Sequence, residues 1–183
     1  MFEWYKNFYK YRKVWNDKKK FKIKGELIEK YVHPYVYLAP SVASKDNTER
    51  QEIEDAIVQE LMAMSGVYLA VSSAALQKGN LPDNPIYKSV SNNFYSKRSG
   101  DIYIVFEPNW YINDFDGLVV ASTHGSPWSY DSYVPVIFAG HGVEDQRVDR
   151  RISTVAIASS IASYLNIKAP SGAFGEVLNE LVE

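Results

Sequence analysis

One stretch, residues 121–143, limits the fold of this chain more than any other. Its first part is rich in turn-forming residues, and Gly125 followed by Ser126 and Pro127 cannot continue a strand. Its second part, residues 134–138, is an apolar run of strand character that stops before Gly140. The pattern predicts a loop that leaves the sheet after residues 118–120 and is held by rigid elements on both sides.

His124 stands at the start of this loop. In α/β folds, functional groups collect where loops leave the ends of buried strands, because the strands fix their position. An imidazole there can serve as a metal ligand or as a general acid or base. The residue types alone leave a simpler alternative open, a loop histidine held by hydrogen bonds.

The residues around His124 resemble the C-terminal signature of the alkaline phosphatase superfamily. The similarity is carried by Thr-His-Gly-Ser-Pro-Trp-Ser-Tyr-Asp at residues 123–131, Val-Pro-Val-Ile-Phe at 134–138 and Gly-His-Gly-Val at 140–143. Residues 98–108 resemble the strand before that signature, and residues 152–167 resemble the closing helix. The resemblance is to the bacterial phosphomonoesterase and phosphodiesterase branch with a Thr nucleophile. It covers the second half of the chain well and the first half loosely.

The resemblance implies a metal role for His124. Enzymes of this family hold two zinc ions with Asp and His side chains, and the histidine of the Thr-His-Gly-Ser loop is one ligand. Zinc lowers the pKa of bound water, clamps phosphoryl oxygens and activates a hydroxyl nucleophile. The nucleophile and the other ligands lie earlier in the family's chain and have no counterpart here. We therefore expect His124 to be a metal ligand and name no catalytic residue.

Three functions are compatible with this resemblance. The first is the C-terminal segment of a metal-dependent phosphate ester hydrolase, a single domain of residues 1–183 that lacks the nucleophile-bearing half and is inactive alone. Its partners would be a phosphate ester substrate and the missing N-terminal half or an unknown protein. The second is a non-catalytic binding or interaction module derived from that fold. The third, a complete small hydrolase, has the least support. Ala156, Ser159 and Tyr133 depart from the family pattern and weaken the assignment to a branch.

Composition narrows these options. The 183 residues, 46% of them hydrophobic and 23% charged, are enough for one good core. A net charge of -2 gives no reason to expect nucleic acid. No apolar run is long enough to span a membrane, and the N-terminus lacks the apolar region of a signal peptide, whereas longer members of the family are typically exported to the periplasm. Because there is no cysteine, a metal would need imidazole and carboxylate ligands, and the three histidines, His33, His124 and His141, form no spaced motif.

Hydrophobic periodicity predicts an α/β fold with a mixed or partly antiparallel sheet. Strands are expected from Tyr68, Ile102, Val119 and Val136, and helices over residues 44–64 and 154–165. The second helix should pack on the sheet through an apolar face of Val155, Ile157, Ala158, Ile161 and Leu165.

Charged clusters are assigned structural roles. The acidic residues of the first helix should be its solvated side, namely Glu49, Glu52, Glu54, Asp55 and Glu60. Arg98 and Asp101 should form an ion pair or a turn contact. The basic and aromatic residues within 1–24 should form a solvated helix face, with a nucleic-acid or membrane surface as the weaker alternative.

Overall fold

A computed structural model describes residues 26–79, 81–111, 114–115, 118–119 and 124–182. The basic and aromatic segment within residues 1–24 lies outside this range, so its predicted helix stays a prediction. The chain divides into two compact units, residues 1–133 and residues 134–183. No helix among the described residues is long and apolar enough to cross a membrane.

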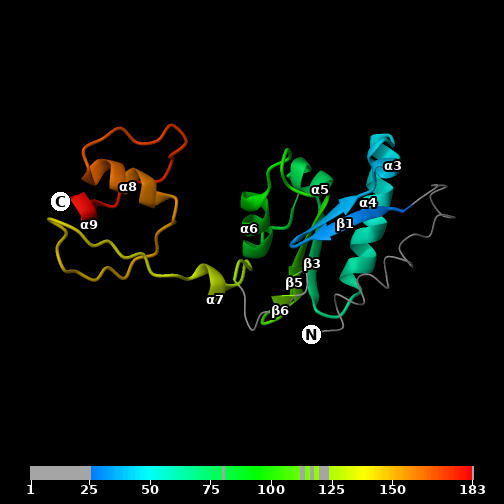
Figure 1. Ribbon diagram of the computed structural model, residues 1–183, viewed down its shortest axis with the longest axis horizontal. Coiled ribbons are helices and arrows are strands. Elements are labelled where there is room, and N and C mark those ends of the chain that lie inside the picture. The colour runs from blue at the N-terminus through cyan, green and yellow to red at the C-terminus, as the bar shows by residue number, and fades with distance from the viewer. Residues whose placement is uncertain (1–25, 80, 112–113, 116–117, 120–123, 183) are drawn as a thin grey trace. The chain divides into compact units, whose positions relative to one another are not determined.

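The first unit contains a four-stranded sheet. Its strands are β1 (Ile28–Val32), β2 (Tyr35–Leu38), β3 (Val67–Ser72) and β4 (Ile102–Phe106), in the spatial order β1-β2-β4-β3. Every pairing in this sheet is antiparallel. Helices accompany the sheet, as an α/β fold requires (Figure 1). The expected strands at Tyr68 and Ile102 are present, although the sheet is antiparallel rather than mixed.

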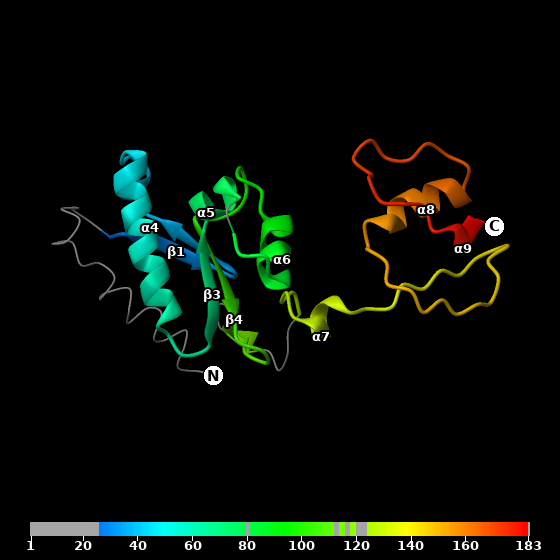
Figure 2. The same ribbon diagram turned by 180° about the vertical axis from the view of Figure 1, so that it is seen from behind.

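Strand β4 is buried along its whole length because both faces of the sheet are covered. Ile102, Ile104 and Phe106 belong to a core cluster that includes residues of α4 (Asn47–Met62) and Val42 of α3 (Pro40–Ala43). Tyr103 and Val105 point to the other face, where they meet α5 (Ser73–Lys78) and α6 (Pro85–Asn93). Figure 2 shows α4 on one side of β3 and β4, with α5 and α6 on the other.

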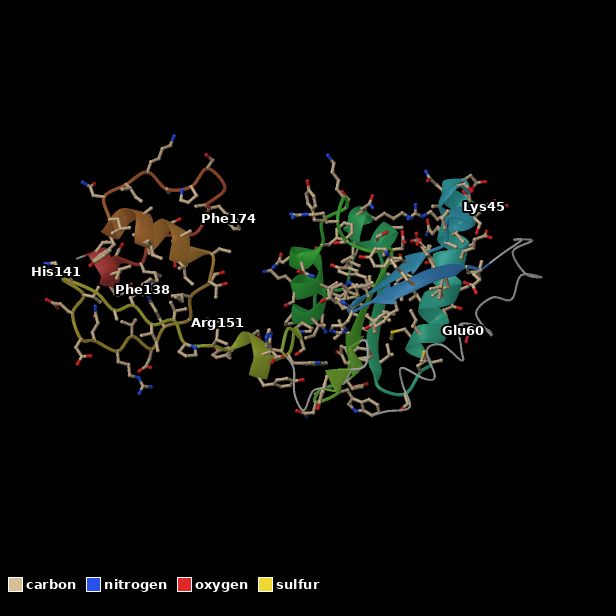
Figure 3. The ribbon with its side chains drawn as sticks, viewed as in Figure 1. Lys45, Glu60, Phe138, His141, Arg151 and Phe174 are labelled. Carbon is tan, nitrogen blue, oxygen red and sulfur yellow. The ribbon has the colours of Figure 1, made fainter. Side chains whose placement is uncertain are left out.

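Helix α4 matches the helix predicted over residues 44–64. Asp46 caps it, because its Oδ1 accepts hydrogen bonds of 2.9 Å from the backbone NH groups of Thr48 and Glu49. Ile53, Ile57 and Leu61 recur at helical spacing and are buried. Glu60, near the end of the helix, is exposed (Figure 3).

Glu54 was wrongly expected on the solvated side of this helix. Its side chain is only 1% exposed, and its Oε1 accepts a 2.8 Å bond from Arg50 Nε. Arg50 Nη2 also donates to Asp101 Oδ1 at 2.7 Å, while Asp101 Oδ2 accepts the Leu38 NH at 2.8 Å. Asp101 is therefore paired with Arg50 of α4 rather than with Arg98, whose guanidinium lies 5.1 Å from the centre of the Tyr95 ring. Burial raises the pKa of Glu54, and the hydrogen bond from Arg50 opposes this shift.

Two short strands, β5 (Asp114–Phe115) and β6 (Leu118–Val119), form an antiparallel hairpin at the predicted place. A one-turn helix, α7 (Ser129–Ser132), follows the His124 loop. Strand β4 and helix α7 both contribute residues to the candidate site of the first unit.

The second unit contains α8 (Ala156–Tyr164) and α9 (Asn179–Val182). The strand predicted from Val136 is wrong for the structure as described. Residues 133–139 have no regular secondary structure and follow an open, extended course after α7 (Figure 1), and no strand of the described chain pairs with them. A strand forms only where a neighbour accepts and donates its backbone hydrogen bonds, and none is present among the described residues.

Helix α8 (Ala156–Tyr164) occupies most of the predicted range 154–165, and its packing on the sheet of the first unit stays a prediction. The buried positions are small residues, namely Ala156, Ser159, Ser160 and Ala162. Of the apolar face expected to pack on the sheet, Val155, Ile161 and Leu165 are exposed by 40%, 41% and 54%. The large apolar side chains of this helix thus have no surface to cover within the described second unit.

Hydrogen bonds and ion pairs tie the second unit together. Ser160 Oγ donates to the Ala156 carbonyl at 2.8 Å and accepts the Leu178 NH at 2.9 Å. Arg150 Nη2 donates to Glu180 Oε2 at 2.9 Å, and this bond lowers the pKa of Glu180 to about 2. At Gly175, an added Cβ would collide with the Val155 carbonyl oxygen, so only glycine permits this close approach.

Candidate functional site

A cavity of about 300 Å³ lies in the first unit, beside the C-terminal end of β4 and the turn that joins β1 to β2. Its walls combine aromatic and aliphatic side chains with polar groups at a few positions. They are formed by His33, Pro34, Tyr103, Ile104, Val105, Phe106, Asn109, Trp110, Tyr111, His124, Gly125, Ser126, Pro127, Tyr130 and Asp131. Binding sites commonly combine such apolar walls with a few placed polar groups.

His124 is an exposed part of this wall. The next residue, Gly125, has a φ of +102°, a backbone conformation that favours glycine. The structure therefore places His124 where the sequence predicted it, on a turn-forming loop and accessible at a cavity. Whether it binds a metal is not decided by this position, so that role stays a prediction.

Trp128 anchors the loop that carries His124. Its indole Nε1 donates a 2.9 Å hydrogen bond to the Phe106 carbonyl at the end of β4. Its ring meets the Tyr68 ring of β3 edge-on, with 4.8 Å between the centroids. The loop is thus fastened to two neighbouring strands of the sheet, β3 and β4.

Asp131 closes the same loop from its other end. Its Oδ2 accepts hydrogen bonds from both the backbone NH and the hydroxyl of Ser126. The neighbouring Tyr130 hydroxyl accepts a 3.0 Å bond from the Asn109 NH, where Asn109 has a φ of +65°. These contacts hold residues 126–131 as a compact turn next to His124.

His33 is a second imidazole in the wall of the cavity, and the sequence analysis did not identify it as a site residue. It lies in the β1–β2 turn, where its Nδ1 is 2.9 Å from the Tyr31 hydroxyl. Its ring stacks on Phe106 with a centroid distance of 5.9 Å and an interplanar angle of 9°. Burial lowers the pKa of His33, so the ring favours its neutral form more than a free histidine does.

A metal would need more ligands than the described part of the chain supplies. Within that part, no group of three or more His, Asp, Glu or Cys side chains could hold a metal ion. His124 is accessible, and an imidazole is a suitable donor for zinc. These residues can therefore provide one ligand but do not form a complete metal site.

Comparison with solved structures identifies the class of protein to which this fold belongs. A crystal structure of the wild-type alkaline phosphatase PafA matches 95% of this chain with a TM-score of 0.76 and 28% identity. A PafA variant with four substitutions matches 94% of the chain with the same TM-score. No family model matches the chain. The fold and the sequence together show that the chain belongs to the alkaline phosphatase superfamily.

Individual relatives agree with this assignment. Alkaline phosphatase PafA of Elizabethkingia meningoseptica is 29% identical over 147 residues, which cover 80% of this chain and 26% of PafA. Alkaline phosphatase PhoV of Synechococcus elongatus is 28% identical over 132 residues, which cover 72% of this chain and 23% of PhoV. A protein of Myroides odoratus named calcium-transporting ATPase is 30% identical over 159 residues, which cover 87% of this chain and 28% of that protein. The chain thus spans about a quarter of the length of these curated relatives.

Proposed function

We propose that this chain is the C-terminal segment of a metal-dependent phosphate ester hydrolase and that His124 contributes one nitrogen to its metal site. The main support is the position of His124, exposed at a cavity on a loop that Trp128 and Asp131 hold in place. A metal ligand must be both accessible to the metal and held in a fixed position. Zinc, when bound, would supply Lewis-acid stabilisation of the phosphoryl group.

The chain on its own is proposed to be inactive. Its described residues offer no group of three metal ligands, and a single imidazole does not retain zinc. In this proposal the remaining ligands and the nucleophile come from the part of the fold that the relatives possess and that this chain does not span.

A chimaera tests the role of His124 directly. Residues 1–183 replace the aligned region of Elizabethkingia meningoseptica PafA, and the purified protein is assayed for zinc content and for hydrolysis of an aryl phosphate and an aryl phosphodiester. The expected result is turnover with zinc bound, and His124→Ala should lower turnover at least ~100-fold and reduce zinc content. His141→Ala is the matched control, because His141 is an exposed turn residue of the second unit. Equal activity of the His124→Ala and unmodified chimaeras would refute the metal role.

The isolated chain provides the second test. We expect no turnover above background and less than one zinc per chain by elemental analysis. Turnover by the isolated chain that His124→Ala abolishes would show instead a complete small hydrolase.

A second candidate function is a binding module that kept the fold without the chemistry. The lack of three grouped metal ligands among the described residues favours it. It predicts that the chimaera folds and remains inactive, so the same assay separates the two functions.

A further inference from the structure

The second unit has an unusual distribution of apolar side chains. Among its described residues, 134–182, the fully buried apolar residues are two alanines and one leucine, Ala156, Ala162 and Leu178. Many of the large apolar residues are instead exposed, namely Val134, Ile137, Val148, Val155, Ile161, Leu165, Ile167, Phe174, Val177 and Val182, and others are half-buried. A unit of about 50 residues cannot be stabilised by so small a core, so another surface has to cover these side chains.

The extended segment 134–139 shows where that surface would attach. None of its backbone NH or carbonyl groups is hydrogen-bonded to any other described residue. Val136 and Phe138 are half-buried, whereas Ile137 between them is 82% exposed. An unpaired extended segment with apolar residues on both sides has the character of an interior strand whose neighbours are absent.

Helix α8 carries a second part of this uncovered apolar surface. Ile161 and Leu165 lie one turn apart at the end of the helix, and Ala158 lies three residues before Ile161. The three residues therefore share one exposed face. The opposite face, with Ala156 and Ser160, is buried within the second unit. The loop residue Phe174, 83% exposed, is a further large apolar side chain without cover (Figure 3).

The comparison with PafA indicates what covers these residues. PafA contains the equivalent of 95% of this chain, which makes up 33% of its own chain, so two thirds of its fold has no counterpart here. We propose that residues 134–139 and the Ile161–Leu165 face of α8 dock onto a polypeptide carrying that remaining part of the alkaline phosphatase fold. Segment 134–139 becomes a strand of the partner's sheet by backbone pairing, and the α8 face covers apolar residues beside it. This inference rests on the proposed function, because the partner is the part that would complete the hydrolase.

Hydrogen exchange on the full chain tests the docking without any measurement of activity. Residues 1–183 are expressed alone and together with tagged PafA from which the aligned region has been deleted. We expect the chain to copurify with the tagged protein as a 1:1 complex. In that complex, exchange of the backbone amides of residues 136–139 should be at least ~100-fold slower than in the chain alone, since pairing protects amides that are open in isolation.

Two variants make the test specific. Ile137→Lys should abolish copurification, because it places a charge in the proposed sheet, while far-UV circular dichroism of the isolated chain stays unchanged because the residue is exposed there. Val32→Lys is the matched control in the first unit. Val32 is 52% exposed, but its strand is already paired with β2, so this variant should still copurify.

Four results would overturn the inference. They are a lack of copurification, a complex in which residues 136–139 are not protected, loss of the complex with Val32→Lys as well, and slow exchange of these amides in the chain alone. If that slow exchange accompanied a dimer, a second copy of the chain would be the true occupant. A protected complex combined with an inactive chimaera would leave the docking intact and refute the catalytic proposal alone.

Discussion

The anchor formed by Trp128 allows a quantitative prediction. Trp128→Phe removes the 2.9 Å hydrogen bond to the Phe106 carbonyl and keeps an aromatic ring against Tyr68. A hydrogen bond of this kind contributes about 1 kcal/mol net. Trp128→Ala also loses the edge-to-face ring contact, worth about 0.5–1.5 kcal/mol, and part of the apolar burial, so we expect a total loss of about 3 kcal/mol.

Native-state hydrogen exchange is the appropriate assay, because the chain has two compact units and a single melting curve would mix them. The slowest amides of β4 report the free energy of unfolding of the first unit. We expect this free energy to fall by about 1 kcal/mol in Trp128→Phe and by about 3 kcal/mol in Trp128→Ala.

Trp110→Phe serves as the control for the loss of an indole. Trp110 lines the same cavity, but its ring nitrogen makes no hydrogen bond within the described part of the chain. A change below about 0.3 kcal/mol in Trp128→Phe, or an equal change in Trp110→Phe, would refute the anchoring role of the hydrogen bond.

Three further predictions concern the first unit. Asp46→Ala should lower the free energy of unfolding by about 1 kcal/mol through loss of the α4 cap, measured by the same exchange assay, with Asp55→Ala on the exposed side as control. Arg50→Met should cost about 3 kcal/mol at neutral pH, because it leaves the buried Glu54 carboxylate unpaired. The folded-state pKa of Glu54 is raised above 4.5, so the folded state binds the proton of the Glu54 carboxyl group more tightly than the unfolded state does. Part of the stability lost in Arg50→Met should therefore be recovered as pH falls from 7 towards 4.5. An equal loss at both pH values would contradict this explanation. The pKa of His33 is lowered from 6.5, so the stability that depends on its neutral form is lost as pH falls below that value. The free energy of unfolding of the first unit, measured at pH 7.5 and 5.5 by the same exchange assay, should differ less between the two pH values in His33→Gln than in the unmodified chain.

Local patterns were sufficient to predict much of the first unit. The helix predicted over residues 44–64 is confirmed, because its capping residue Asp46 and the helical spacing of Ile53, Ile57 and Leu61 all act within one helix. The strand at residues 102–106 was also predicted, because a short apolar run bounded by Gly100 and Pro108 suits a strand covered on both faces.

Features that depend on distant segments could not be predicted in the same way. The burial of Glu54 follows from its pairing with Arg50 beside Asp101, 51 residues from Arg50 in sequence. His33 reaches the cavity because the β1–β2 turn brings it onto Phe106, and no spacing in the sequence signals that contact. For the His124 loop, the turn residues and the resemblance both located the histidine, but neither revealed the role of Trp128 as its anchor.

The missing strand at Val136 and the exposed apolar face of α8 have a common physical cause. The strand from Val136 and the apolar face of α8 were predicted from patterns that describe buried elements. The described second unit leaves Ile137, Ile161 and Leu165 exposed, because it contains no sheet to receive them. These patterns thus describe a larger folded environment than the second unit provides.

The hydrogen bond that holds Trp128 does not depend on which side chain stands at position 106. It is the main-chain oxygen of residue 106, whereas the side chain of Phe106 forms part of the cavity wall. Every amino acid offers the same main-chain oxygen, so replacing Phe106 by a smaller or larger apolar residue reshapes the wall without removing the acceptor. Mutation can therefore change which molecules the cavity admits while the histidine-bearing loop keeps its attachment.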